Sequence, residues 1–384
     1  MNNITYVTYQ TFPANTANSL QTITNLKFLA KKKHNVRLIF PNRSLDSSDD
    51  LKTLQSHYQF SEFFEINMLS HNLLFRDYKG KALFKKIRFH LSHYLWSKKA
   101  YKFIESSKRT SDVFITRSDW LFYFLAKKNK KVIFECHQVS KLRTYLIKKC
   151  LKFEKIKIVF THPLLLQDFK IDEKYSEKCE VLHNAYDEDF FNNNVKKKDS
   201  NTVIFVGNLL RFGKTRSIEF IIDAFNDSRL DTFNLKVVGG PSSESKKYKE
   251  LVKKKKVKNI KFLGHLPRDE TLFEMQKAKI GLLINSSESK HSLRHTSPLK
   301  YFEYLRARLQ IVAVDFPSHR ELPLSEKIIF FKENNKEMFI QKLYEQKDIE
   351  AIDNLEYEEF SYTTRVKKIE KIIARLEGLE PPTL

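Results

Sequence analysis

Short apolar runs alternate with longer amphipathic segments along the whole chain. The runs are rich in β-branched and aromatic residues, as NVRLIF at 35–40 and QIVAVD at 310–315 illustrate. Continuous apolar strands are typical of parallel sheets that helices cover on both faces, so the pattern predicts an α/β fold built from βαβ units. The expected strands are 4–9, 35–40, 112–117, 131–136, 157–162 and 179–184 in the first half, and 202–207, 235–240, 260–265, 280–285, 310–315 and 327–332 in the second.

This apolar pattern is broken at residues 187–201, where the sequence DEDFFNNNVKKKDSN is dominated by asparagine, lysine and acidic residues. A chain of 384 residues also exceeds what one hydrophobic core usually organises. We therefore expect two α/β domains joined by this linker. The predicted boundaries are 1–186 for the N-terminal domain, 187–201 for the linker, 202–355 for the C-terminal domain, 356–377 for a C-terminal helix and 378–384 for a disordered tail.

The glycines are concentrated in the second half of the chain, mostly where a predicted strand ends. Ligands of open α/β sheets bind at the carboxyl ends of the strands. Any one of these glycines could simply serve a tight turn, but the set predicts that the C-terminal domain makes most of the ligand contacts. Six of the eight glycines belong to it: Gly207, Gly213, Gly239, Gly240, Gly264 and Gly281.

The stretch HTSPLKYFEYLRARLQIVAVD, residues 295–315, predicts a short helix that runs into a strand. Ser297 is the expected N-cap and Pro298 occupies the first turn, where a missing N–H costs nothing. The amides of the first turn then form an anion site at the positive helix end. Lys300 and Glu303 share a face, so a carboxylate stands one turn behind, within reach of ribose hydroxyls. The alternative is a well-capped helix with a surface Lys–Glu pair.

A second element, VGNLLRFGKTRSIEFIIDAF at 206–225, predicts a strand, a glycine-containing loop and a helix. Arg211, Lys214 and Arg216 lie in or beside the loop, where cations can neutralise charge on a departing nucleoside diphosphate. The Gly-Lys-Thr at 213–215 lacks the earlier glycine of a Walker motif, because Asn208 stands there, so ATP hydrolysis is not expected.

The net charge of +23 and the pI near 9.6 favour anionic partners: nucleic acid, acidic lipid head groups or phosphorylated small molecules. Part of the lysine excess reflects a compositional bias, so charge alone does not choose among them. The three cysteines have no metal-ligand spacing and adjoin apolar runs, which predicts reduced thiols. With no signal-peptide pattern and no apolar run near the ~18 residues of a membrane span, we expect a cytoplasmic protein.

Residues 84–104, FKKIRFHLSHYLWSKKAYKFI, interleave basic with apolar and aromatic residues at helical spacing. Such a helix could rest on an anionic membrane surface and attach the protein peripherally to the inner face of the cytoplasmic membrane. It could equally place its apolar face in the core of the first domain and its lysines in solvent. The sequence leaves both interpretations open.

These segments together resemble glycosyltransferase family 4, whose members are retaining enzymes of the GT-B fold: two facing Rossmann-like domains with a C-terminal helix that crosses back to the first domain. The resemblance covers nearly the whole chain, and its strength lies in the order and spacing of the motifs. The segments that carry it are IFECHQVSK (133–141), VLHNAYDEDFF (181–191), VGNLLRFGK (206–214), FLGHLPRDETLFEMQKAKIGLLIN (262–285), TSPLKYFEYLRARLQIVAVDFPSHREL (296–322) and FSYTTRVKKIEKII (360–373).

The resemblance implies a transfer of sugar from a nucleoside-diphosphate sugar to a cell-envelope glycan or lipid-linked acceptor, with no cofactor and no obligatory metal. The first domain would lie on the acceptor side and the second would bind the donor. Lys214 and Arg211 would hold the diphosphate, and His137 would approach the transferred sugar. Glu303 would bind the ribose. The other implied donor contacts are Gly207 and Asn208 in the loop, the backbone of His265 and Leu266 at the nucleobase, and Ser297, Pro298, Leu299 and Lys300 at the phosphates.

Three positions depart from the family pattern. Asn208 stands where the family has an arginine, so Arg211 or Arg216 has to supply the second cation. His295 replaces the first of a pair of glutamates that would contact the sugar. The N-terminal glycine loop is FPANTANS (12–19). Asn15 and Asn18 there tolerate glycine-like backbone conformations but leave less room.

Two other classes of function remain open. The departures at Asn208 and His295 suit a GT-B-fold epimerase or an inactive relative. Basic charge with interspersed aromatics also suits a nucleic-acid-binding protein. The lysines are scattered and no zinc-finger or RNA-recognition signature occurs, so nucleic acid is not the expected partner.

Overall fold

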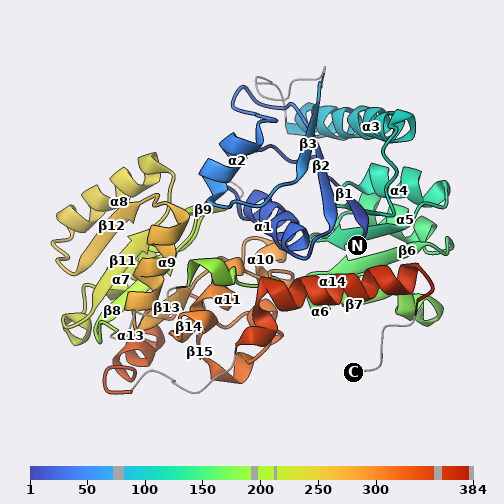
Figure 1. The fold of residues 1–384 in the computed structure, drawn as a ribbon. Helices are drawn as coiled ribbons and strands as arrows, with labels where there is room; N and C mark the ends of the chain where they lie inside the picture. The colour runs from blue at the N-terminus through green and yellow to red at the C-terminus, as the bar shows by residue number, and fades with distance from the viewer. Residues whose placement is uncertain (72–81, 192–197, 212–213, 350–356, 380–384) are drawn as a thin grey trace. The chain divides into compact units, whose positions relative to one another are not determined.

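The computed structural model describes residues 1–71, 82–191, 198–211, 214–349 and 357–379 (Figure 1). The chain forms two compact units. Unit 1 consists of Met1–His183 and Tyr362–Leu384, and unit 2 of Asn184–Ser361. The C-terminal helix α14 (Tyr362–Leu376) thus returns to the first unit, within the range predicted for a C-terminal helix. Residues 380–384 of the predicted tail lie outside the described residues.

Within the described residues, unit 1 contains seven parallel strands in the order β3-β2-β1-β4-β5-β6-β7. The strands are β1 (Asn3–Val7), β2 (Asn35–Pro41), β3 (Glu65–Leu69), β4 (Val113–Thr116), β5 (Val132–Cys136), β6 (Ile156–Phe160) and β7 (Cys179–Val181). The helices are α1 (Ala17–Lys31), α2 (Leu51–Tyr58), α3 (Ala82–Ser106), α4 (Asp119–Lys127), α5 (Lys141–Cys150), α6 (Pro163–Phe169) and α14.

In the described part of unit 2, six parallel strands follow the order β12-β11-β8-β13-β14-β15, beside a two-stranded antiparallel hairpin β9-β10. The strands are β8 (Thr202–Val206), β9 (Leu210–Arg211), β10 (Lys214–Thr215), β11 (Asn234–Val238), β12 (Ile260–Gly264), β13 (Ile280–Leu283), β14 (Gln310–Val314) and β15 (Ile328–Phe331). The helices are α7 (Ile218–Ala224), α8 (Ser242–Lys254), α9 (Arg268–Lys277), α10 (Lys290–Arg294), α11 (Leu299–Arg306), α12 (Pro317–Arg320) and α13 (Lys336–Tyr344).

The predicted strands are confirmed, each within three residues at its ends. Two elements were missed. Strand β3, with the sequence EINML, lies at the sheet edge and is only partly buried, so it lacks a continuous apolar run. The β9–β10 hairpin lies within what the sequence indicated as a plain loop, because strands of two residues give no periodicity.

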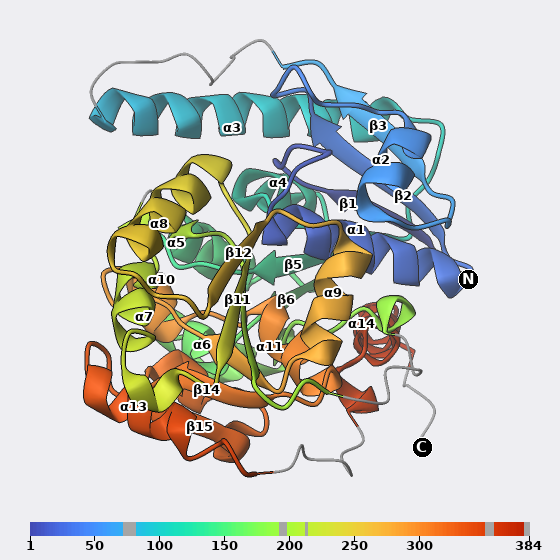
Figure 2. The same ribbon diagram turned by 90° about the vertical axis from the view of Figure 1, so that its left-hand side faces the viewer.

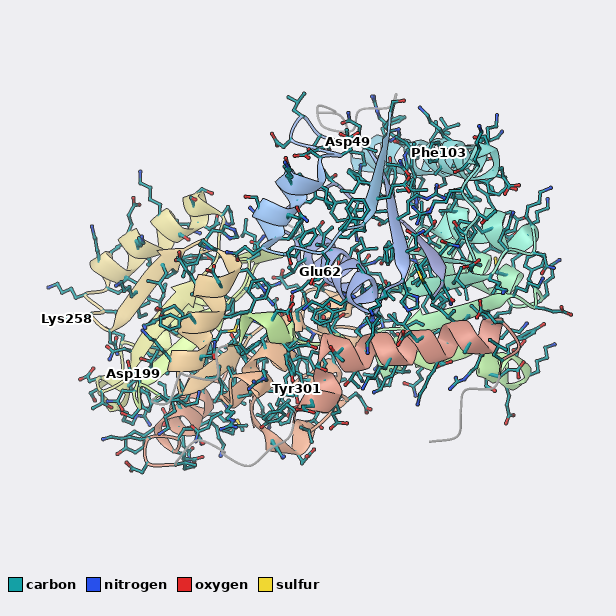
Figure 3. The ribbon with its side chains drawn as sticks, in the orientation of Figure 1. Asp49, Glu62, Phe103, Asp199, Lys258 and Tyr301 are labelled. Atoms are coloured by element: carbon teal, nitrogen blue, oxygen red, sulfur yellow. The ribbon has the colours of Figure 1, made fainter. Side chains whose placement is uncertain are left out.

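Helices cover both faces of each sheet. In unit 1, α3, α4 and α5 pack on one face through residues such as Trp96, Phe122 and Ile147, while α1 and α14 lie side by side on the other (Figure 1). In unit 2, α7, α8 and α13 cover one face and α9 with α11 the other (Figure 2). Tyr301 of α11, labelled in Figure 3, is fully buried in this second layer.

A buried ion pair fixes α14 to unit 1. Arg365 donates from Nη2 to Glu135 Oε1 at 3.1 Å, from Nε to the carbonyl of His183 at 3.1 Å and from Nη1 to Asn25 Oδ1 at 3.4 Å. Tyr6 donates its hydroxyl to Glu135 Oε2 at 2.5 Å. Burial raises the pKa of Tyr6 well above its usual value, so the hydroxyl keeps its proton. Glu135, on strand β5, therefore holds the returning helix in place.

In the part of the chain that the structure describes, no helix has both the length and the apolar character needed to cross a bilayer.

Candidate functional site

The carboxyl ends of β8 and β11 meet at two glycines. Gly207 follows β8 with φ +143° and Gly239 follows β11 with φ +136°, conformations that side chains rarely adopt. A Cβ at Gly239 would lie 2.0 Å from the carbonyl oxygen of Gly207. The two strand-end loops can approach each other this closely only because Gly239 has no side chain.

Replacing Gly239 by alanine is therefore expected to destabilise unit 2 by about 2–5 kcal/mol, since both the backbone and the contact become strained. Gly264 is a matched control, because it also has a positive φ, of +75°, but a Cβ there would meet nothing within 4 Å. Gly264→Ala should cost only about 1–2 kcal/mol. Denaturant unfolding followed by circular dichroism compares the two, and equal losses would contradict the close approach.

After Gly207 the chain forms the β9–β10 hairpin, in which Lys214 pairs with Arg211. The side chain of Asn208, at the position where a second arginine was expected, accepts a hydrogen bond from the Leu210 amide on Oδ1 at 2.9 Å. Asn208 thus holds the start of the hairpin. The side chains of Arg211 and Lys214 lie outside what the structure describes, so their predicted contacts stay predictions.

Two cations converge on Gly207. A Cβ built on this glycine would lie 3.1 Å from Arg216 Nη1 and 4.0 Å from Lys300 Nζ. Lys300 is buried, with Nζ 4.2 Å from the centroid of the Phe205 ring and 3.5 Å from the Leu282 carbonyl. Residues distant in sequence therefore place two positive charges beside the loop that follows β8.

Arg216 has no carboxylate partner among the described residues. Its Nε is buried without a hydrogen-bond partner. Burial lowers the pKa of the guanidinium to about 10, so it is still protonated at neutral pH. A protonated, partly buried guanidinium without a counterion is suited to bind an anion such as a diphosphate.

Helix α11 begins one residue later than the sequence suggested. Its N-cap is Pro298, which offers no side-chain acceptor to the first-turn amides, so the prediction that Ser297 is the N-cap is wrong. Ser297 is instead fixed by Asn184, whose amide N donates to Ser297 Oγ at 3.2 Å and whose Nδ2 donates to the Ser297 carbonyl at 2.5 Å. The tertiary contact outcompetes local capping.

The Glu303 carboxylate forms a buried ion pair with Arg268 of α9. Lys300 and Glu303 are 9% and 2% exposed, so the alternative of a surface Lys–Glu pair is wrong. Arg268 contacts Oε1 and is the carboxylate's one hydrogen-bond partner in the described part of the chain, which leaves Oε2 for a ligand hydroxyl. The sequence does not reveal the role of Arg268, because nothing in RDETLF distinguishes it from a surface arginine.

Tyr304 positions α11 against the sheet. A Cβ at Gly281 on β13 would lie 2.7 Å from the Tyr304 ring, so the glycine lets the ring lie flat on the strand. The Tyr304 hydroxyl accepts a hydrogen bond from the Val206 amide at 3.1 Å. This contact ties α11 to the end of β8 and so brings Lys300 to Gly207.

The remaining predicted residues of unit 2 lie at nearby strand and helix ends. His265 and Leu266 follow β12. The His265 side chain is exposed, and the Leu266 carbonyl accepts a hydrogen bond from Thr271 Oγ1 at 3.3 Å. His295 caps the C-terminus of α10, is only 3% exposed, and donates its amide to the His291 carbonyl at 3.0 Å.

Three predicted residues belong to unit 1. Asn15 is exposed in the loop after β1, and Asn18 is the second residue of α1, where its Oδ1 accepts from Arg117 Nη2 at 3.2 Å. Neither has a positive φ, so the loop uses no glycine-like conformation at these two asparagines. The chain enters α1 through Thr16, an N-cap whose side chain accepts a hydrogen bond from the Ser19 amide. His137 is half-buried directly after β5.

Among the described residues, no three His, Cys, Asp or Glu side chains are grouped so that they could hold a metal ion. Two cations lie beside the glycine loop at Gly207: Arg216, and Lys300 from the first turn of α11. This set can hold a diphosphate and stabilise the negative charge that grows on it when a bond to it breaks.

Residues 187–358 match the family described as glycosyl transferases group 1. A search of curated proteins found no match. Among solved structures, a glycosyltransferase from Rickettsia africae ESF-5 is 14% identical, with a TM-score of 0.65 over 98% of this chain and 99% of that chain. Anabaena Alr3699/HepE, solved with UDP and glucose, is 11% identical, with a TM-score of 0.62 over 98% and 100%.

The lipopolysaccharide outer core galactosyltransferase WaaB is 12% identical, with a TM-score of 0.63 over 97% of this chain and 99% of that chain. At these identities the structures show the fold, which they share over nearly the full length of each chain. Together with the two parallel sheets and the returning helix α14, they establish the GT-B fold. Residues 187–358 accordingly match the glycosyl transferases group 1 family, and the chain as a whole has the GT-B fold.

Proposed function

We propose that this protein is a retaining glycosyltransferase that moves a sugar from a nucleoside-diphosphate sugar to a cell-envelope glycan or lipid-linked acceptor. The observation that carries the proposal is the convergence of Arg216 and Lys300 on Gly207. Arg216 takes the role of the arginine that Asn208 replaces. Both cations lie beside the loop that follows the first strand of unit 2, where an open α/β sheet binds its ligand.

The other donor contacts follow from this position. The first-turn amides of α11, at Leu299 and Lys300, face the same anion. Glu303 binds the ribose through Oε2, while Arg268 holds Oε1 and orients the carboxylate. Lys214 and Arg211 add positive charge from the hairpin. The backbone at His265 and Leu266 contacts the nucleobase, and His137 of unit 1 approaches the transferred sugar.

In the proposed reaction the bond between the anomeric carbon and the diphosphate breaks, and the acceptor oxygen bonds to that carbon on the same face of the sugar. The acceptor hydroxyl gives its proton to the departing phosphate oxygen. Arg216 and Lys300 stabilise the charge that accumulates on the diphosphate. The protein supplies position and electrostatics, and no carboxylate nucleophile or obligatory metal is assigned.

A thermal-shift screen against UDP-, GDP- and ADP-sugars and the free diphosphates tests donor binding without an acceptor, because a ligand of the folded state raises the melting temperature. UDP and UDP-glucose are tested first, since the similar Anabaena structures hold them. We expect one nucleotide class to raise the melting temperature of the wild type more than inorganic diphosphate does. In Glu303→Gln the two ligands should raise the melting temperature equally.

Absence of a shift with every nucleotide would refute the donor assignment, and retention on DNA that falls with salt would then favour the nucleic-acid-binding alternative. The specific observation behind a second candidate is His295, which is buried where the family has a glutamate. Donor binding without transfer to any acceptor would favour an epimerase or an inactive relative. In a productive reaction, the anomeric configuration of the product decides whether the enzyme is retaining.

A further inference from the structure

Helix α3 of unit 1 carries apolar side chains on two opposite sides. On its inner side, Trp96, Ala100 and Ile104 are at most 6% exposed and belong to the unit 1 core. Phe103, labelled in Figure 3, packs against the same cluster. The sequence left open whether this helix packs in the core or lies on a membrane. These inner residues supply the core contacts of the helix, so the apolar residues on its outer side are not needed for packing against unit 1.

Its outer side is exposed and apolar along the first half of the helix. Phe84, Ile87, Leu91 and Leu95 are 56%, 55%, 52% and 45% exposed. They are spaced by three or four residues, so they form one continuous stripe on a helix. At 1.5 Å per residue the stripe is about 17 Å long. A stripe of four large exposed side chains of this kind marks an interaction surface.

Basic residues continue the same side of the helix. Counted at about 100° per residue, Lys98 and Lys102 fall within the sector of the stripe, Arg88 and Lys99 lie roughly 20° and 40° beyond its edge, and all four are exposed. Lys98 and Lys102 make no ion pair among the described residues. The single acidic residue of α3, Glu105, is paired with Lys130 at 3.1 Å. We call these eight residues, from Phe84 to Lys102, the outward face of α3.

We propose that the outward face of α3 docks on an anionic lipid bilayer. An interfacial helix buries its apolar side chains at the boundary of the acyl chains while its lysines meet acidic head groups, and this face offers both. Nucleic acid would use the lysines but leave the apolar stripe in water. A second copy of the chain would place like charges against each other, at a cost in free energy. Docking would bring the enzyme to the inner face of the cytoplasmic membrane.

The test is co-sedimentation of the full-length protein with vesicles, either of phosphatidylcholine alone or of equal parts phosphatidylcholine and phosphatidylglycerol. We expect binding to the anionic vesicles that weakens with salt, and much weaker binding to the neutral ones. The variant Leu91→Ser/Leu95→Ser should lower the partition coefficient at least about tenfold, because two leucine side chains no longer leave water. Lys98→Gln/Lys102→Gln should lower it about tenfold on anionic vesicles only.

Matched controls come from unit 2. Phe273→Ser removes an apolar side chain of α9 that is 42% exposed, and Lys253→Gln/Lys254→Gln removes two exposed charges at the end of α8. Neither should change the partition coefficient. Wild-type levels of binding in the leucine variant, or no binding by the wild type, would overturn the proposal. So would a wild-type dimer that becomes monomeric in the leucine variant, because the face would then be a contact between copies.

The proposal does not depend on the proposed function. The leucine variant should keep its thermal shift with the donor, since its substitutions lie in unit 1 and the cations at Gly207 in unit 2. If the leucine variant loses vesicle binding and still binds the donor, its substitutions affect the docking face and not the donor site. Vesicle binding by a protein that binds no nucleotide would retain the docking face and refute the transferase.

Discussion

Arg216→Gln is expected to weaken donor binding by about 10- to 100-fold without lowering the stability of the unliganded protein. A hydrogen bond to a charged group contributes about 1.5–3 kcal/mol, which corresponds to that loss of affinity. The folded state loses nothing comparable, because Arg216 has no carboxylate partner in the described chain and its buried Nε has no hydrogen-bond partner. Removing such a group can even raise the melting temperature, as is common for residues kept for function.

Isothermal titration with the donor identified by the thermal-shift screen measures this effect. Arg229→Gln is the control in the same unit: Arg229 is paired with Asp227 at 2.9 Å and with Glu337 at 2.5 Å at the surface. This control should bind the donor normally and lose little stability, because an exposed, solvent-screened ion pair contributes little. If Arg216→Gln binds the donor as the wild type does, Arg216 does not hold the diphosphate.

Arg365→Met is expected to destabilise unit 1 by about 3–5 kcal/mol. The substitution leaves the Glu135 carboxylate buried with only the Tyr6 hydroxyl among its described partners, and an uncompensated buried charge costs about that much. Both tryptophans of the chain, Trp96 and Trp120, belong to unit 1. Urea unfolding followed by tryptophan fluorescence therefore reports on this unit.

Arg375→Met is the matched control, because Arg375 lies on the same helix and pairs with Glu180 at 2.6 Å in an exposed position. Its loss should cost at most about 1 kcal/mol. In Glu135→Gln/Arg365→Met no buried charge is left, so part of the stability should return. Equal destabilisation by Arg365→Met and Arg375→Met would show that the buried pair does not hold α14.

The site could be predicted in part from the sequence. Local sequence was enough to indicate four of its residues: Gly207, Arg216, Lys300 and Glu303. Glycines at strand ends and cations beside a loop can be recognised from the residues next to them. Arg268 could not be recognised in this way, since its role comes from Glu303, a residue of another helix. The prediction of the α11 N-cap was wrong for the same reason, a contact with a residue distant in sequence. Local preference favoured Ser297, whereas the structure fixes that serine through Asn184.

Glu135 illustrates a similar limit. In the sequence Glu135 lies two residues before His137, the predicted sugar contact, and nothing local indicates its partner. In the structure its carboxylate pairs with Arg365 of the returning helix. Helix α3 shows the reverse case. The sequence offered a core helix and a surface helix as alternatives, and the structure has both characters on opposite sides of the same helix. Helical periodicity indicates where the apolar residues lie, but it does not indicate which of two apolar sides packs against the core.

Except for β3 and the β9–β10 hairpin, the sequence by itself determined the strands, together with the division into two α/β halves and the half that carries the glycine loop. These features depend on contiguous runs, and burial of a run requires only that some helix cover it. The tertiary structure alone decided that Arg216 and Lys300 meet at Gly207, that Arg268 orients Glu303, and that four apolar residues of α3 stay in solvent. Each of these depends on how separate elements pack, and packing joins residues whose distance along the chain carries no signal.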